Sequence, residues 1–156
     1  MASLRERIVE ELTARFGALA GWTSKRAAGV ESISNDCSAF VAIESESKVP
    51  QMTEWFENTL SIAVLVVVQE EKADPVEDGG NALAYLDRKV AELEASIHSA
   101  AVVLDEQEIR LTVTGHSIEP LPVAPDNLRR AVLSVEAKYR HAWNDPTSSS
   151  PYFVNG

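Results

Sequence analysis

The stretch from Thr59 to Gln69, TLSIAVLVVVQ, decides the fold of this chain. In an extended backbone its alternate positions place apolar side chains on both faces, and four valines and one isoleucine are β-branched. Such side chains lose rotamer freedom in a helix and pack well on a pleated sheet. The stretch therefore predicts the central strand of a single sheet, covered on both faces and with one face near a partner chain. A short buried helix is the alternative that periodicity alone does not remove.

Length and composition indicate one globular domain. The chain has 156 residues, of which 45% are hydrophobic and 24% are charged. No segment approaches the roughly 20 consecutive apolar residues of a membrane span, and the N-terminus lacks the features of a cleaved signal, so we expect a protein that stays where it is synthesised. The formal charge of −10 opposes a tight grip on nucleic acid, although DNA can slide past such a surface without binding.

Motifs of catalysis and metal binding are absent from the sequence. No phosphate-binding glycine loop, nucleophile elbow or paired-histidine motif occurs, and the single cysteine, Cys37, has the character of a small buried hydrophobe. The nearest enzyme-like set is His116 with Asp105 or Glu106, and nothing in the spacing brings these residues together. A surface turn histidine beside solvated carboxylates is the simpler interpretation. We therefore expect no enzyme activity, no catalytic residue, no cofactor and no metal.

Two amphipathic helices are predicted. Ser3 and Glu6 have the spacing of a capping box before a first helix that ends between Gly17 and Gly21. Asn81 is placed to cap a second helix that extends to about Ser99. Apolar residues that recur every three or four positions give each helix one buried side. In the second helix these are Leu83, Leu86, Val90, Leu93 and Ile97.

Alternating apolar residues predict four strands, over residues 38–45, 59–69, 109–114 and 131–140. The segments between them are expected to be loops or short connections, at 22–37, 49–58, 100–107 and 115–127. The element order αββαββ predicts an α+β two-layer sandwich, in which two helices cover one face of a mostly antiparallel four-stranded sheet. The domain is expected to span residues 1–141, and residues 142–156 to form a flexible or partner-docked C-terminal tail.

Three groups of residues are candidate contact surfaces. Trp55 and Phe56 are large aromatic residues in an expected connection, where they either cover the sheet or contact another subunit. A second group is a solvated acidic loop, for which a cation site is an alternative although the spacing matches no calcium-loop pattern. The third group is the aromatic pair in the C-terminal tail. The loop and tail residues are Glu70, Glu71, Asp74, Glu77, Asp78, Tyr152 and Phe153.

The order of these segments resembles a known family. A leading helix and TLSIAVLVVVQ are followed by the acidic loop, YLDRKVAELEASI, EIRLTVTGHSIEP and RRAVLSVEAKYRHAWNDP. The last segment carries a Tyr139-Arg140 pair and, soon after it, Asp145-Pro146. Over roughly residues 3–146 this pattern is similar to the tail terminator family of long-tailed bacteriophages, which are minor tail proteins that complete the tail tube. The long proline-containing segment after Gly115 and the extended tail depart from a compact terminator.

The resemblance implies a structural virion protein. A member of this family forms a homo-hexameric ring that caps the head-proximal end of the tail tube, ends tube polymerisation and presents a face to the head-tail connector or neck protein. DNA would pass through the lumen without specific binding, and no membrane partner is implied. The alternatives are a related neck or head-tail completion protein and a small cytosolic ligand-binding domain or enzyme.

Overall fold

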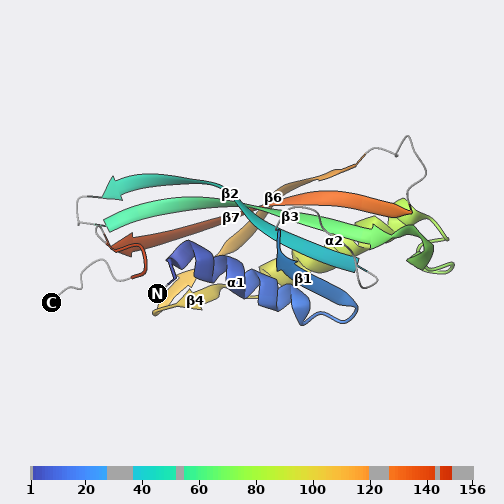
Figure 1. Ribbon diagram of the computed structural model, residues 1–156, viewed down its shortest axis with the longest axis horizontal. Helices are drawn as coiled ribbons and strands as arrows, with labels where there is room; N and C mark the ends of the chain where they lie inside the picture. The colour runs from blue at the N-terminus through green and yellow to red at the C-terminus, as the bar shows by residue number, and fades with distance from the viewer. Residues whose placement is uncertain (1, 28–36, 52–54, 120–126, 143–144, 149–156) are drawn as a thin grey trace.

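The protein, described here by a computed structural model, is an elongated twisted sheet with both helices on one side (Figure 1). The structure describes residues 2–27, 37–51, 55–119, 127–142 and 145–148. The elements follow the order α1 (Leu4–Gly17), β1 (Trp22–Arg26), β2 (Cys37–Gln51), β3 (Trp55–Gln69), the 3-10 turn η1 (Glu70–Lys72), α2 (Ala82–His98), β4 (Val102–Leu104), β5 (Gln107–Ile109), β6 (Leu111–Ile118) and β7 (Leu128–Ala142).

Strand β3 lies in the middle of a five-stranded sheet with the order β1-β2-β3-β7-β6. It pairs antiparallel with β2 and β7 along almost its whole length, from Trp55 opposite Gln51 and Ala142 to Gln69 opposite Leu128. Strands β2, β3 and β7 each have 15 residues. The position of the predicted central strand is thus confirmed, and the strand begins four residues earlier than its sequence pattern suggested.

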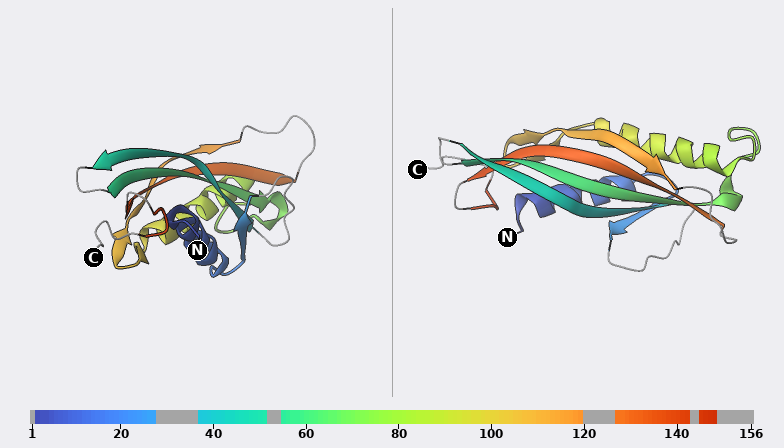
Figure 2. Two further views of the ribbon diagram at one scale, coloured as in Figure 1. Left: turned by 60° about the vertical axis from the view of Figure 1, so that its left-hand side comes forward. Right: turned by 90° about the horizontal axis from the view of Figure 1, so that it is seen from above.

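The hydrophobic core fills the space between the helices and one face of the sheet. Side chains of β3 on this face, from Leu60 through Val64 to Val68, are 0% exposed. They pack with the buried stripes of both helices and with the alternate residues of β7. The left view of Figure 2 shows α1 and α2 together below the sheet. Burial of β-branched and aliphatic side chains in one cluster therefore holds the two layers together.

The prediction of a mostly antiparallel four-stranded sheet with order αββαββ is wrong. The sheet has five strands and is mixed, because Trp22–Arg26, expected to be a loop, forms β1 and pairs parallel with β2. Trp22 is only 4% exposed and belongs to the core. Packing of this indole and pairing with β2 stabilise a strand whose Thr, Ser, Lys and Arg residues gave no local apolar pattern.

The connection after α2 also differs from expectation. It forms a separate two-stranded sheet of β4 and β5, whose turn residues Asp105 and Glu106 have positive φ angles of 48° and 70°. Val102 is 1% exposed and belongs to the core, whereas Val103 is 61% exposed. A tight hairpin alternates its side chains between two faces, so only one of the adjacent valines can reach the core.

Other strand and helix limits are corrected by tertiary pairing. Strand β2 continues through Pro50 to Gln51, and β3 includes residues 55–58 of the expected 49–58 connection. Proline is tolerated there because the outer edge of β2 pairs with β1 only over Cys37–Val41. Both helices are confirmed, with side-chain caps from Ser3 and Asn81, but Leu83 is 38% exposed in the first turn of α2. No described helix is long and apolar enough to span a bilayer.

Candidate functional site

The face of the sheet away from the helices carries a part-exposed apolar patch. On β3, Ala63 and Leu65 point to this face, and register places Val132 of β7 opposite Leu65. All three are intermediate in exposure. We call Ala63, Leu65 and Val132 the open-face patch. The predicted cover on both faces of β3 is therefore incomplete, because the helices cover only the opposite face.

A shallow groove of about 430 Å³ follows the open-face patch toward the edge of the sheet. Leu65, Ile118 and Val132 line it, and the Arg130–Glu119 ion pair, with an N–O distance of 3.1 Å, closes its rim. A solvated sheet face usually carries polar side chains. Contiguous apolar side chains rimmed by charged ones indicate a contact surface.

Trp55 stands at the end of the sheet where β3 begins, which we call the distal end. The Arg140 guanidinium lies 5.3 Å from the centre of the Trp55 ring, within the range of a cation–π contact. Both residues line a pocket of about 160 Å³, which we call the tip pocket. Its other lining residues are Glu57, Gln107, Lys138 and Tyr139. Lys138 is 69% exposed, so the pocket has a cationic rim.

Gln107 of the β4-β5 hairpin holds the outer edge of β7 beside this pocket. Its side-chain amide donates to the carbonyl oxygen of Arg140 at 3.0 Å and accepts from the Arg140 backbone N–H at 2.8 Å. The amide thus replaces one residue of a neighbouring strand, because β6 pairs with β7 only as far as Ala137. These bonds set the position of the backbone that carries Arg140.

Phe56, adjacent to Trp55, points to the other face and joins a polar cluster there. Its ring lies 5.3 Å from the His141 ring and 5.7 Å from Lys48 Nζ. Lys48 Nζ lies 3.1 Å from Glu46 Oε1 and donates to Asn58 Oδ1 at 3.3 Å, while the Tyr139 hydroxyl donates to Glu46. Burial raises the pKa of Tyr139 well above its usual value, and the hydrogen bond to Glu46 raises it further.

The acidic loop lies at the opposite end of β3, which we call the proximal end, and its carboxylates organise the loop itself. Asp78 accepts from Arg88 at 2.9 and 3.0 Å and from the Asp74 backbone N–H at 2.8 Å. Asp74 accepts from the backbone N–H groups of Val76 and Glu77 at 2.7 and 2.9 Å. These hydrogen bonds lower the pKa of both aspartates. Val76 at the loop tip is left 90% exposed.

The predicted contact residues thus occupy two ends of the molecule. Trp55 and Phe56 are at the distal end, on opposite faces, and the acidic residues are at the proximal end (Figure 1). Glu70 pairs with Arg129 at 2.8 Å, Glu77 pairs with Arg88 at 3.2 Å, and Glu71 is exposed. Tyr152 and Phe153 lie outside the described residues. In the part of the chain that the structure describes, no three possible metal ligands gather.

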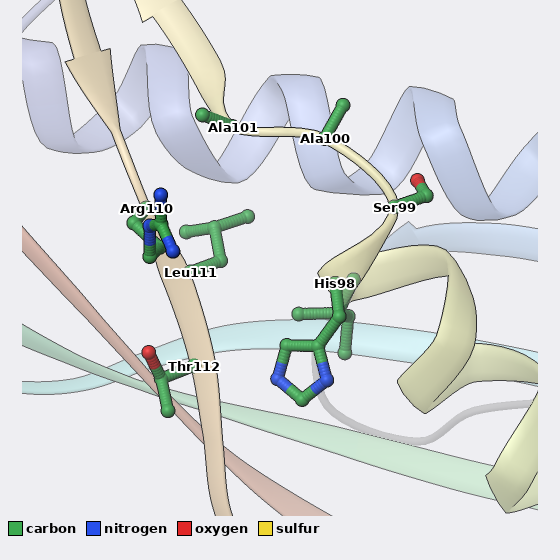
Figure 3. Close-up of a pocket in the computed structure, with 8 residues that line it drawn as sticks. His98, Ser99, Ala100, Ala101, Arg110, Leu111 and Thr112 are labelled. Carbon is green, nitrogen blue, oxygen red and sulfur yellow. The ribbon is translucent and has the colours of Figure 1, made fainter.

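The predicted enzyme-like set is not brought into one site. Asp105 pairs with Arg7 of α1 at 3.2 Å, while His116 is exposed on β6. A cavity of about 450 Å³ lies between the end of α2 and the start of β6, with His98 and Arg110 in its lining (Figure 3). The fold already uses His98, because its Nε2 accepts from the Val113 backbone N–H at 3.1 Å. We therefore interpret this hydrogen bond as a cap on the edge of β6 and do not assign the cavity as a ligand site.

Sequence reasoning missed several contributors to these surfaces. The sequence pattern places Val76 only in an acidic loop and Gln107 only in a connection. Lys138 and Arg140 lie in the predicted strand 131–140, but the register of β3 with β7 decides that they line one pocket with Trp55. The alternation of residues 131–140 was the available signal, since it places Lys138 and Arg140 on one face. A search of protein-family models finds no match to this chain, and a search of curated proteins finds no similar sequence.

Proposed function

We propose that this protein is a structural subunit that assembles into a ring and works as a tail terminator of a long-tailed bacteriophage. In this role it caps the head-proximal end of the tail tube and ends tube polymerisation. Its other face meets the head-tail connector or neck protein. The protein is a virion component, and its function resides in surfaces and not in a catalytic site.

The observation that carries the proposal is the two-faced sheet. One face is buried under α1 and α2, while the open-face patch leaves Leu65 and Val132 part-exposed in a groove rimmed by charge. A monomer gains nothing from apolar side chains in this position, and a subunit interface does. Such a surface supports assembly with a second protein chain, which is what ring formation requires.

The other features of the proposal agree with a ring around DNA. The formal charge of −10 lets DNA pass through a lumen without sticking. Asp105, one residue of the enzyme-like set, pairs with Arg7 of α1, and His98 in the cavity accepts from the Val113 backbone N–H. A terminator also needs one face that binds the tube and another face that does not bind a further tube subunit. The helix side and the sheet side of this protein differ enough to serve these two purposes.

Native mass spectrometry across a concentration series, with negative-stain imaging of the same samples, tests the proposal. We expect six-membered assemblies with a central hole, whose population increases with protein concentration. Leu65→Lys should lower this population without unfolding the subunit, because it places a charge in the open-face patch. Glu10→Lys, on the exposed side of α1, is the control. A wild-type protein that stays monomeric at every concentration contradicts the ring.

A further inference from the structure

We infer that neighbouring subunits contact each other head to tail, with the acidic loop of one copy docked in the tip pocket of the next. The inference rests on the proposed ring and names the two surfaces that close it. One surface is the loop Glu70–Asp78, whose exposed tip is Val76. The other is the tip pocket beside Trp55, Lys138 and Arg140.

The two surfaces belong to opposite ends of the same strand. Strand β3 begins at Trp55 and ends at Gln69, directly before the loop. Fifteen extended residues span about 50 Å. The loop therefore cannot reach the tip pocket of its own chain, and only a second copy can bring them together. Figure 1 shows the loop after β3 and the start of β3 at the two far ends of the molecule.

Charge is complementary between the ends. Residues 70–78 contain five carboxylates and one lysine. Arg129 pairs with Glu70, Arg88 pairs with Glu77 and Asp78, and Glu71 is exposed, so the loop keeps an excess of negative charge. Among the residues that line the tip pocket, Lys138 and Arg140 are cationic and Glu57 is a carboxylate, and Glu136 Oε1 lies 4.0 Å from Lys138 Nζ. Opposite potentials steer two surfaces together and fix their register. The same charges oppose contact between two acidic loops or two tip pockets, which favours the head-to-tail arrangement over a two-fold one.

Shape and apolar character also match. Val76 is 90% exposed, which is unusual for a β-branched apolar residue at a charged loop tip. The carboxylate of Asp74 holds the Val76 and Glu77 backbone N–H groups, so the tip is preorganised. The tip pocket of about 160 Å³ has the volume of about five water molecules, which is enough for one aliphatic side chain beside the Trp55 ring. An apolar anchor surrounded by charge is the usual anatomy of an interface centre.

A head-to-tail contact has a consequence for symmetry. Because it joins two different surfaces, each copy presents one free loop and one free pocket until the chain of contacts closes. Closure gives a ring, and an even-numbered ring accepts two alternating kinds of subunit. That property makes a charge exchange between two variants possible.

The experiment uses two full-length variants and their mixture. Lys138→Glu with Arg140→Glu reverses the pocket, and Glu71→Lys with Glu77→Lys reverses the loop. Each alone should raise the protein concentration at half-assembly by about tenfold or more, because like charges then face each other. An equimolar mixture should assemble again, since each reversed pocket meets a reversed loop and each native pocket meets a native loop. Native mass spectrometry identifies rings with equal numbers of both subunits by their mass, and circular dichroism checks that each variant is folded.

Two further variants complete the design. Val76→Ser should weaken assembly without changing charge, and Glu10→Lys with Asp87→Lys should not, because both of these acidic residues are exposed on the helices. Assembly of the reversed variants at wild-type concentrations overturns the head-to-tail contact while the ring itself stands. Loss of assembly in each variant without recovery in the mixture overturns it too. A wild-type protein that never assembles overturns the proposed function together with this inference.

Discussion

Nζ of Lys48 lies 2.8 Å from Nε2 of His141 at the distal end of the sheet. A lysine ammonium has no lone pair, so Nε2 must accept, and Nδ1, which is 2.7 Å from the Ala142 carbonyl oxygen, must donate. The fold thus holds His141 neutral in one tautomer. Burial is the main reason that the pKa of His141 lies below its usual 6.5, and the charge of Lys48 lowers it further, against opposing contributions from the Ala142 carbonyl and from Glu46.

This geometry predicts a pH dependence of stability. The unfolded chain takes up a proton near pH 6.5, while the folded imidazole does so only at lower pH. The contribution of His141 to the free energy of unfolding should therefore be constant above pH 6.5 and fall as the pH decreases from 6.5 toward the lower pKa of the folded state. Urea denaturation between pH 5 and 8 measures this slope. His141→Gln should flatten it, whereas the exposed His116→Gln should leave it unchanged. An unaltered slope in His141→Gln contradicts the assignment.

Leu65 and Leu133 test the two faces of the sheet by the same chemical change. Leu133→Ala removes a fully buried side chain and should lower the free energy of unfolding by about 2–5 kcal/mol. Leu65→Ala, on the part-exposed face, should cost about 1 kcal/mol or less and weaken self-association instead. Denaturant unfolding and native mass spectrometry of both variants separate the two effects. Equal losses of stability in Leu65→Ala and Leu133→Ala would contradict a part-exposed Leu65 on the open face of the sheet.

Trp55 and Phe56 should fail in different ways when replaced by alanine. Trp55→Ala removes the wall of the tip pocket and the partner of Arg140, so we expect a folded subunit that no longer assembles. Phe56→Ala exposes the polar cluster of Lys48 and His141, so we expect lower stability, with assembly retained in the folded fraction. Unfolding curves combined with oligomer mass decide between these outcomes. Wild-type assembly of Trp55→Ala excludes the pocket from the interface.

The β4-β5 turn offers a stabilising substitution. Glu106 has a φ of 70°, a conformation that costs free energy in any residue with a Cβ atom. Glu106→Gly should raise the free energy of unfolding by about 0.5–1 kcal/mol, because Asp-Gly is a preferred pair for a two-residue hairpin turn. Thermal unfolding measures the gain. Glu108→Gly, within the adjacent strand, should instead destabilise the protein, and a gain there as well contradicts a turn-specific effect.

Local patterns were enough for the parts of the fold that repeat with a regular period. The stripe through Leu86, Val90 and Leu93 predicted α2, and the alternation after Ala131 predicted most of β7. Capping residues Ser3 and Asn81 located the helix starts to within a residue. Such features depend on neighbours within a few positions, which the sequence displays directly.

The remaining features depend on contacts between distant segments. Trp22–Arg26 is a strand because β2 provides a parallel partner. Pro50 can be part of β2 because β1 pairs with the outer edge of β2 only over Cys37–Val41. In the polar cluster at the distal end, Lys48 meets His141, which is 93 positions away in the chain. In the tip pocket, the register of β3 with β7 brings Trp55 beside Arg140. No local pattern carries this information, since register is set by the whole hydrophobic face.

Sequence alone therefore specified an α+β protein with two amphipathic helices, a central β-branched strand and an acidic loop, because side-chain periodicity and turn chemistry are local properties. Tertiary structure alone decided that the sheet is mixed and five-stranded and that Trp55 and Phe56 face opposite sides. It also decided that the tip pocket and the acidic loop lie at opposite ends of β3. The physical reason is that pairing and burial are shared between segments far apart in the chain. Their free energy is gained only once the whole sheet has formed.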